Sequence, residues 1–155
     1  MKSAKLEKNF GRKDLLVILD SNEYIFALGA IRKVTCERLI EEVAQRAEDI
    51  TARITRLIVD EVRNNLTPEA FKEFMIFIKK LTTIDEEFLV PFELGAKYES
   101  LGFKPADAFI AAYTEYVGAD ILVSENRHFL TRHSNLPFKI LTAEKCLHLI
   151  KHPLR

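Results

Sequence analysis

The chain has 155 residues with 48% hydrophobic and 30% charged side chains, which is ordinary usage for one globular domain with its own core. The formal net charge is zero, so no global basic field attracts nucleic acid, and any polyanion site must be local. The two cysteines have no CxxC spacing, which argues against a disulfide framework or a zinc site and favours a reduced, cytoplasmic interior. No apolar run suits a signal peptide or a membrane span.

The first thirteen residues differ in composition from the rest of the chain. Residues 1–13 contain five lysines or arginines and one glutamate, which predicts a flexible basic arm before a single domain over 14–155. Such an arm is either a solvated tail or a segment that contacts phosphates.

Short aliphatic runs alternate with segments of helical periodicity from residue 15 onward. The run LLVILD is continuously apolar up to its final acid, as in a strand that is buried on both faces. Predicted strands cover 15–20, 50–55, 81–84, 120–124 and 138–141, and predicted helices cover 35–49, 56–66, 66–80, 91–102, 104–118 and 142–151. This alternation predicts an α/β fold with three layers, α/β/α, around a central parallel sheet.

Polar side chains follow two of the predicted strands. Asp20 and Asn22 come after the first strand, and Glu125 and Asn126 come after the strand ending at 124. Ligands of open parallel sheets bind beyond the carboxyl ends of the strands, so these residues are candidates for a site. An acid in this place also serves as the N-cap of a following helix, which remains an alternative. Asp120 precedes its strand and is expected on the opposite rim.

Glu61 is an acid on the apolar face of a predicted helix. At about 100° per residue it shares that face with Ile58 and Val62, whereas Asp60 lies on the polar face. An inward carboxylate needs a cationic partner, a metal or a raised pKa. A salt bridge at the edge of the core is the alternative to a functional role.

Asp107 lies in the first turn of a helix that is apolar on nearly all sides. Helix dipoles favour an anion there, so a structural role is sufficient for Asp107 alone. Together with Asp20 and Glu61, however, it makes a third inward acid. Three converging carboxylates without matching cations favour Mg²⁺ or Mn²⁺, which typically serve phosphate-ester hydrolysis.

The ordered set of motifs VILDSN, IVDEV, PADAFIAA and ADILVSENRHF, followed by FKILT, resembles PIN-domain nucleases from about Leu15 to the C-terminal helix. The resemblance implies a compact α/β/α domain and Mg²⁺- or Mn²⁺-dependent cleavage of RNA. It implies that Asp20, Glu61 and Asp107 are metal ligands. The fourth acid of the motif falls at Asn126, where many members have Asp and some have Asn.

The departure at Asn126 removes one charge from the implied site, so a second metal is expected to bind less tightly. The position of Ser124 often carries Ser or Thr in the family and is expected to hold a ligand or a water, while the neighbouring Glu125 should point elsewhere. Arg127 and His128 are candidates for RNA phosphate contacts at the mouth of the site. The alternative is a solvated Arg127 and a His128 that caps the turn.

The resemblance implies an endoribonuclease, of the kind that often acts as a homodimeric toxin inhibited by a cognate antitoxin. A catalytically weak module that binds RNA or protein is the alternative, and Asn126 is the feature that favours it. A phospho-acceptor receiver domain is excluded, since an acid pair after the first strand and a late lysine are missing. A nucleotide-binding glycine loop is also absent from the sequence.

Overall fold

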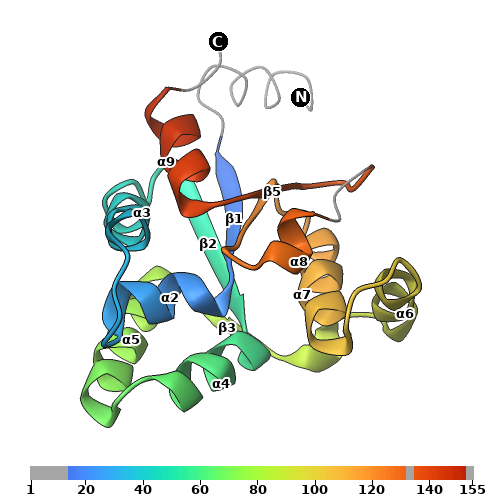
Figure 1. The fold of residues 1–155 in the computed structure, drawn as a ribbon, viewed down its shortest axis with the longest axis horizontal. Helices are drawn as coiled ribbons and strands as arrows, with labels where there is room; N and C mark the ends of the chain where they lie inside the picture. Colours follow the sequence, from blue (N-terminus) through green and yellow to red (C-terminus); the bar gives the residue numbers. More distant parts are fainter. Residues whose placement is uncertain (1–13, 132–134, 153–155) are drawn as a thin grey trace.

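The computed structural model describes residues 14–131 and 135–152, so the predicted basic arm over 1–13 lies outside the described residues. A five-stranded sheet with the order β3-β2-β1-β4-β5 runs through the centre (Figure 1). Every strand pair is parallel: β1 (Leu15–Leu19), β2 (Ile50–Thr55), β3 (Ile84–Asp85), β4 (Ile121–Val123) and β5 (Lys139–Leu141). The predicted three-layer α/β/α fold is confirmed. None of the helices in the described ranges is long and apolar enough to cross a membrane.

The helices fill the connections between the strands. In chain order they are α2 (Ser21–Leu28), α3 (Val34–Gln45), α4 (Arg56–Asn65), α5 (Pro68–Leu81), the 3₁₀ turn η1 (Glu87–Leu89), α6 (Phe92–Ser100), α7 (Pro105–Tyr116), α8 (Arg127–Leu130) and α9 (Ala143–Lys151). In Figure 1, α3 and α5 lie to the left of the sheet, and α6 and α7 lie to its right. Helices therefore flank the sheet on both sides. This agrees with right-handed crossovers, in which the chain leaves β1 towards one edge of the sheet and later returns to β4 on the other side of β1.

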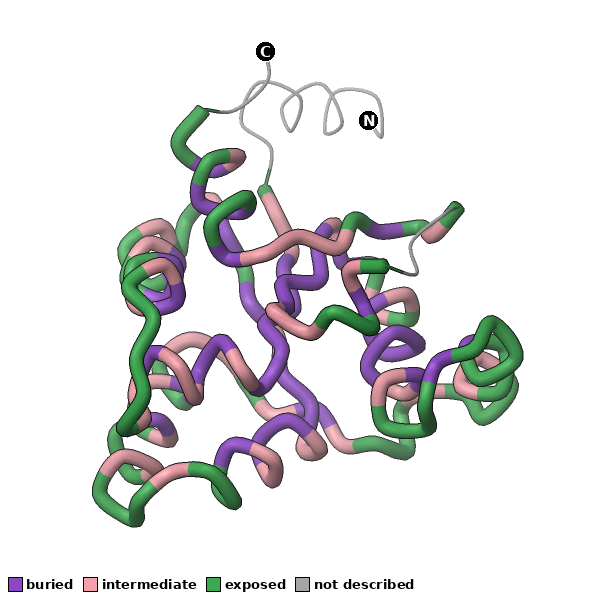
Figure 2. The backbone as a smooth tube through the Cα atoms, viewed as in Figure 1, coloured by how far each residue is buried: buried purple, intermediate pink, exposed green. Residues whose placement is uncertain are grey.

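The central strands are buried on both faces, which explains their continuous apolar sequence. Val17, Ile18 and Leu19 of β1 are fully buried, and all of β4 is buried. Figure 2 shows the buried residues following the sheet, with exposed residues on the outer faces of the helices. Leu19 pairs with Val123, so the residues that follow each strand leave the sheet side by side.

Several elements differ from the sequence-based prediction: α2, η1 and α8 were not predicted, and α3, α5 and β3 have other bounds. Helix α2 was not predicted, because its sequence SNEYIFAL has no apolar stripe with a polar opposite face. Helix α5 continues through Leu81, so β3 begins only at Ile84. Helix α3 ends at Gln45, short of the predicted end at residue 49, and Ala47 beyond it is exposed.

The strand order reverses between β1 and β4. The chain leaves β1 towards β2, whereas it leaves β4 towards β5 on the other side of the sheet. In open parallel sheets this reversal opens a crevice at the carboxyl ends of the two strands, where ligands bind. The polar residues after β1 and β4 are therefore at the topological position that favours a site.

Candidate active site

A cleft of about 480 Å³ opens at the carboxyl ends of β1 and β4. Its polar lining includes the four predicted metal ligands and Asn22 from the first turn of α2; these lining residues are Asp20, Asn22, Glu61, Asp107 and Asn126. They come from the end of β1, from α2, α4 and α7, and from the turn between β4 and α8. The structure therefore brings together residues that are far apart in the sequence.

Asp20 is fixed at the base of the cleft by backbone and side-chain hydrogen bonds. Its Oδ1 accepts from the Ser21 amide at 2.8 Å, and its Oδ2 accepts from the Ser124 hydroxyl at 2.7 Å. The backbone N–H of Asn126 in turn donates to Ser124 Oγ at 3.0 Å. Asp20 thus caps α2 and also lines the cleft. Burial raises its pKa in spite of these hydrogen bonds, and the nearby Asp107 raises it further.

Glu61 faces the cleft from α4, on the side of the helix that its spacing predicted. Burial, and then the charges of Asp20 and Asp107, raise the pKa of Glu61. Its Oε1 is buried and has no hydrogen-bond partner among the described residues. The neighbouring Asp60 is about half exposed and lies 3.8 Å from Arg63 on the outer face of the helix.

Asp107 lies in the first turn of α7, as predicted, and lines the same cleft. Burial raises the pKa of its carboxyl group, while His128, Lys104 and a hydrogen bond from Asn126 lower it. The Asn126 Oδ1 accepts from the His128 amide at 2.9 Å, so Asn126 is the N-cap of α8. Arg127 and His128 are exposed in that short helix.

The electrostatics of the cleft fit a divalent cation. Within residues 14–131 and 135–152, the carboxylates of Asp20, Glu61 and Asp107 form no ion pair with a lysine or arginine. Each has a raised pKa, and one buried Glu61 oxygen lacks any partner. Carboxylate and amide oxygens are ligands that Mg²⁺ and Mn²⁺ prefer.

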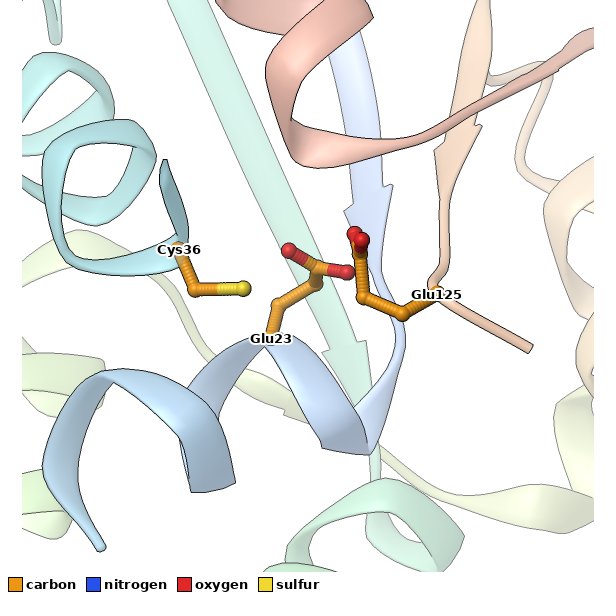
Figure 3. Close-up of side chains that lie close together, drawn as sticks. All are labelled: Glu23, Cys36 and Glu125. Atoms are coloured by element: carbon orange, nitrogen blue, oxygen red, sulfur yellow. The ribbon is translucent and has the colours of Figure 1, made fainter. Parts of the chain in front are cut away.

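Glu125 turns away from the cleft, as expected from its place beside Asn126. Its carboxylate accepts a hydrogen bond from the Ala143 amide at 2.9 Å and lies with Glu23 and Cys36 (Figure 3). We call Glu23, Cys36 and Glu125 the buried cluster. Sequence reasoning missed it, because Glu23 lies on the helix that was not predicted and Cys36 was considered only for spacing to the other cysteine.

The sequence matches no protein-family model and no curated protein. Solved structures do resemble the fold. The crystal structure of VapBC2 from Rickettsia felis, bound to a DNA fragment from its promoter, contains a chain that is 18% identical with a TM-score of 0.58, covering 82% of this chain and 98% of that one.

The crystal structure of FitAcB from Neisseria gonorrhoeae contains a chain that is 13% identical with a TM-score of 0.58, covering 83% of this chain and 98% of that one. Both neighbours are toxin–antitoxin complexes with a PIN domain. The predicted resemblance is thus confirmed at the level of the fold.

Proposed function

We propose that this protein is a divalent-metal-dependent endoribonuclease that hydrolyses RNA phosphodiester bonds in the cleft between β1 and β4. The observation that carries this proposal is that three carboxylates from separate elements line one cleft and that, among the described residues, none of them forms an ion pair with a lysine or arginine. Such a group is costly to ionise unless a cation compensates the repulsion. The PIN-type fold of the structural neighbours supports the same activity.

Asp20, Glu61, Asp107 and Asn126 would hold Mg²⁺ or Mn²⁺ through oxygen atoms. When bound, such an ion polarises a phosphate oxygen and lowers the pKa of water. Ser124 positions the ligands, because its hydroxyl group joins Asp20 to the backbone of Asn126. The amide at position 126 leaves the site one negative charge short of four carboxylates, so we expect a second ion to be held less tightly.

RNA would approach the cleft past Arg127, His128 and Asn22. His128 is exposed, and its charge acts on Asp107, which places it near the acidic group. Arg127 precedes it in the same turn of α8, and Asn22 lines the cleft from α2. Because the chain has no net charge, binding of phosphates must depend on such local groups.

We further propose that the protein is the toxin of a toxin–antitoxin pair, acting in the cytoplasm as a homodimer and inhibited by a cognate antitoxin. Both structural neighbours are toxin–antitoxin complexes, which supports this role. A small DNA-binding protein encoded by the adjacent reading frame should bind this chain and suppress its RNA cleavage. Failure of that protein to bind would remove the toxin role and leave the nuclease proposal intact.

The decisive experiment is cleavage of a mixed set of labelled RNAs in Mg²⁺ or Mn²⁺, comparing the wild type with Asp20→Asn and Asp107→Asn. Loss of a metal ligand should lower the rate at least about 100-fold, since even outer-shell partners of a metal contribute 10- to 100-fold. Asp60→Asn is the matched control, because Asp60 is next to Glu61 but faces solvent. Equal cleavage by all four proteins would show a contaminating nuclease and refute the assigned site.

The alternative is a module that binds RNA or protein without cutting, and the amide at Asn126 favours it. The variant Asn126→Asp separates the two functions. Cleavage by the wild type that is lost in Asp20→Asn and Asp107→Asn establishes the nuclease. If the wild type binds RNA without cutting and Asn126→Asp cuts, the chain is a binding module that lost activity at this position.

A further inference from the structure

We propose that the buried cluster of Glu23, Cys36 and Glu125 is a second cation site, suited to Zn²⁺. Each residue offers one ligand atom, and these atoms all lie within 4.8 Å of one another. Figure 3 shows Glu23 on α2 pointing towards both Cys36 on α3 and Glu125 in the turn after β4. This site is separate from the proposed nuclease centre and does not depend on its activity.

Glu23 provides the independent evidence for a ligand. It is 0% exposed, and neither of its carboxyl oxygens meets hydrogen-bond geometry with a partner in the part of the chain that the structure describes. Its polar neighbours are the Cys36 thiol and the second carboxyl group, that of Glu125. No lysine or arginine within the described ranges forms an ion pair with Glu23 or Glu125. A buried carboxyl group in this position needs a bound cation or a bound proton, because an unpaired buried charge is strongly unfavourable.

The ligand atoms of the buried cluster favour a softer cation than the oxygen atoms of the cleft do. A thiolate with two carboxylates suits Zn²⁺, whereas Mg²⁺ prefers sites made entirely of oxygen. Ligand atoms of a tetrahedral zinc site lie roughly 3.3–3.6 Å apart, so side-chain movements of about 1 Å bring these three into range. Three protein ligands leave the fourth position to water.

A bound ion would connect the elements that build the cleft. Glu23 lies on α2, which begins directly after Asp20, and Glu125 immediately precedes Asn126. Glu125 also accepts from the first amide of α9, which packs beside α3 (Figure 1). Zinc binding should therefore raise the melting temperature of the whole domain, since it stabilises the folded state alone.

Cobalt titration of the full chain, freed of metal with a chelator, tests this site directly. Co²⁺ bound to a thiolate shows charge-transfer absorption in the near ultraviolet, and an ion held only by oxygen atoms in the cleft does not. We expect this absorption to saturate near one equivalent, to disappear on adding Zn²⁺, and to persist in excess Mg²⁺. Absence of the absorption in the wild type would overturn the proposal without any variant.

Two variants test the ligands Cys36 and Glu23, and two further variants serve as controls. Cys36→Ser should abolish the absorption, and Glu23→Gln should weaken Co²⁺ binding at least about 10-fold. Cys146→Ser is the matched control, because Cys146 is also a buried free thiol but lies outside the cluster. Asp20→Asn should retain the absorption, which keeps this result distinct from any failure of the nuclease proposal. Absorption that survives Cys36→Ser, or that is lost in Cys146→Ser, would refute the assigned ligands.

Discussion

The acidic cleft and the buried cluster are built from neighbouring residues but have opposite environments. Asp20 and Glu23 lie at the start of α2, and Glu125 and Asn126 are adjacent after β4. Asp20 and Asn126 line a cleft, whereas the side chains of Glu23 and Glu125 lie close to Cys36 in the buried cluster, outside the lining of that cleft. One pair of strand ends therefore supports two groups of acids, because successive residues of each turn point in different directions.

The two groups also differ in how their acids are accommodated. Asp20 accepts two hydrogen bonds at the base of a cleft, while the polar neighbours of Glu23 are the Cys36 thiol and the Glu125 carboxyl group. Burial, followed by the adjacent Glu125 carboxylate, raises the pKa of Glu23 to about 9. At neutral pH without a metal, Glu23 is therefore protonated. The cleft presents oxygen ligands in a space where a cation can enter, and the cluster must bind either a proton or a cation.

Among changes outside the proposed metal ligands, Ser124→Ala should have the largest effect on the cleft. This change leaves Asp20 Oδ2 without its 2.7 Å hydrogen bond, and it removes the oxygen that accepts from the backbone N–H of Asn126. We expect Mn²⁺ affinity to fall about 10- to 100-fold and the free energy of unfolding to fall by about 1–3 kcal/mol. Calorimetric titration and urea unfolding measure these two quantities.

Thr55→Val is the matched control for Ser124→Ala. Thr55 is also a fully buried hydroxyl residue, at the end of β2, but its oxygen has no hydrogen-bond partner among the described residues. Its removal should be neutral or stabilising and should leave Mn²⁺ affinity unchanged. Equal effects of the two substitutions would contradict a positioning role for Ser124.

Glu23→Gln should change the pH dependence of stability in the metal-free protein. The folded chain keeps a proton on Glu23 up to a pKa of about 9, whereas the ordinary pKa is 4.5. Since the folded state binds more protons between these values, the free energy of unfolding should fall as the pH rises from 4.5 to about 9. The variant should lose this slope and melt several degrees above the wild type at pH 9.

Melting curves recorded from pH 5 to pH 9 in the presence of a chelator measure the pH slope of stability for the wild type and Glu23→Gln. Glu93→Gln serves as the control, because Glu93 is exposed near the start of α6 and should leave the wild-type slope unchanged. Parallel slopes for the wild type and Glu23→Gln would show that Glu23 keeps its charge in the folded chain.

The smallest effect is expected from Asn126→Asp, which makes the cleft more acidic. A fourth carboxylate should tighten Mn²⁺ binding by about 10-fold, since an added charge near a cation contributes roughly 1 kcal/mol or more. Without metal, the same change should slightly lower stability, because the added carboxylate faces Asp107. Calorimetric titration measures the affinity, and weaker binding would indicate that the amide oxygen is the better-placed ligand.

Much of the candidate site could be predicted because its residues have clear local signatures. Asp20 and Asn126 follow buried strands, and parallel strands bring their carboxyl ends to one edge. Helical spacing placed Glu61 on the inner face of α4, and Pro105 placed Asp107 in the first turn of α7. The bounds of β3 and the early end of α3 were predicted wrongly, because tertiary pairing decides such boundaries more than local sequence does.

The buried cluster shows what local patterns cannot provide. Glu23 lies on a helix without an amphipathic pattern, and nothing near Cys36 in the sequence indicates two carboxylates beside its thiol. The sequence by itself indicated the alternation of strands and helices and the placement of three acids, because continuous apolar runs mark buried strands, the period of 3.6 residues marks the inner face of a helix, and Asp20 and Asp107 stand at the ends of such elements. The tertiary structure decided that β1 lies beside β4, and this long-range pairing brings Asp20 to Ser124 and Glu23 to Glu125.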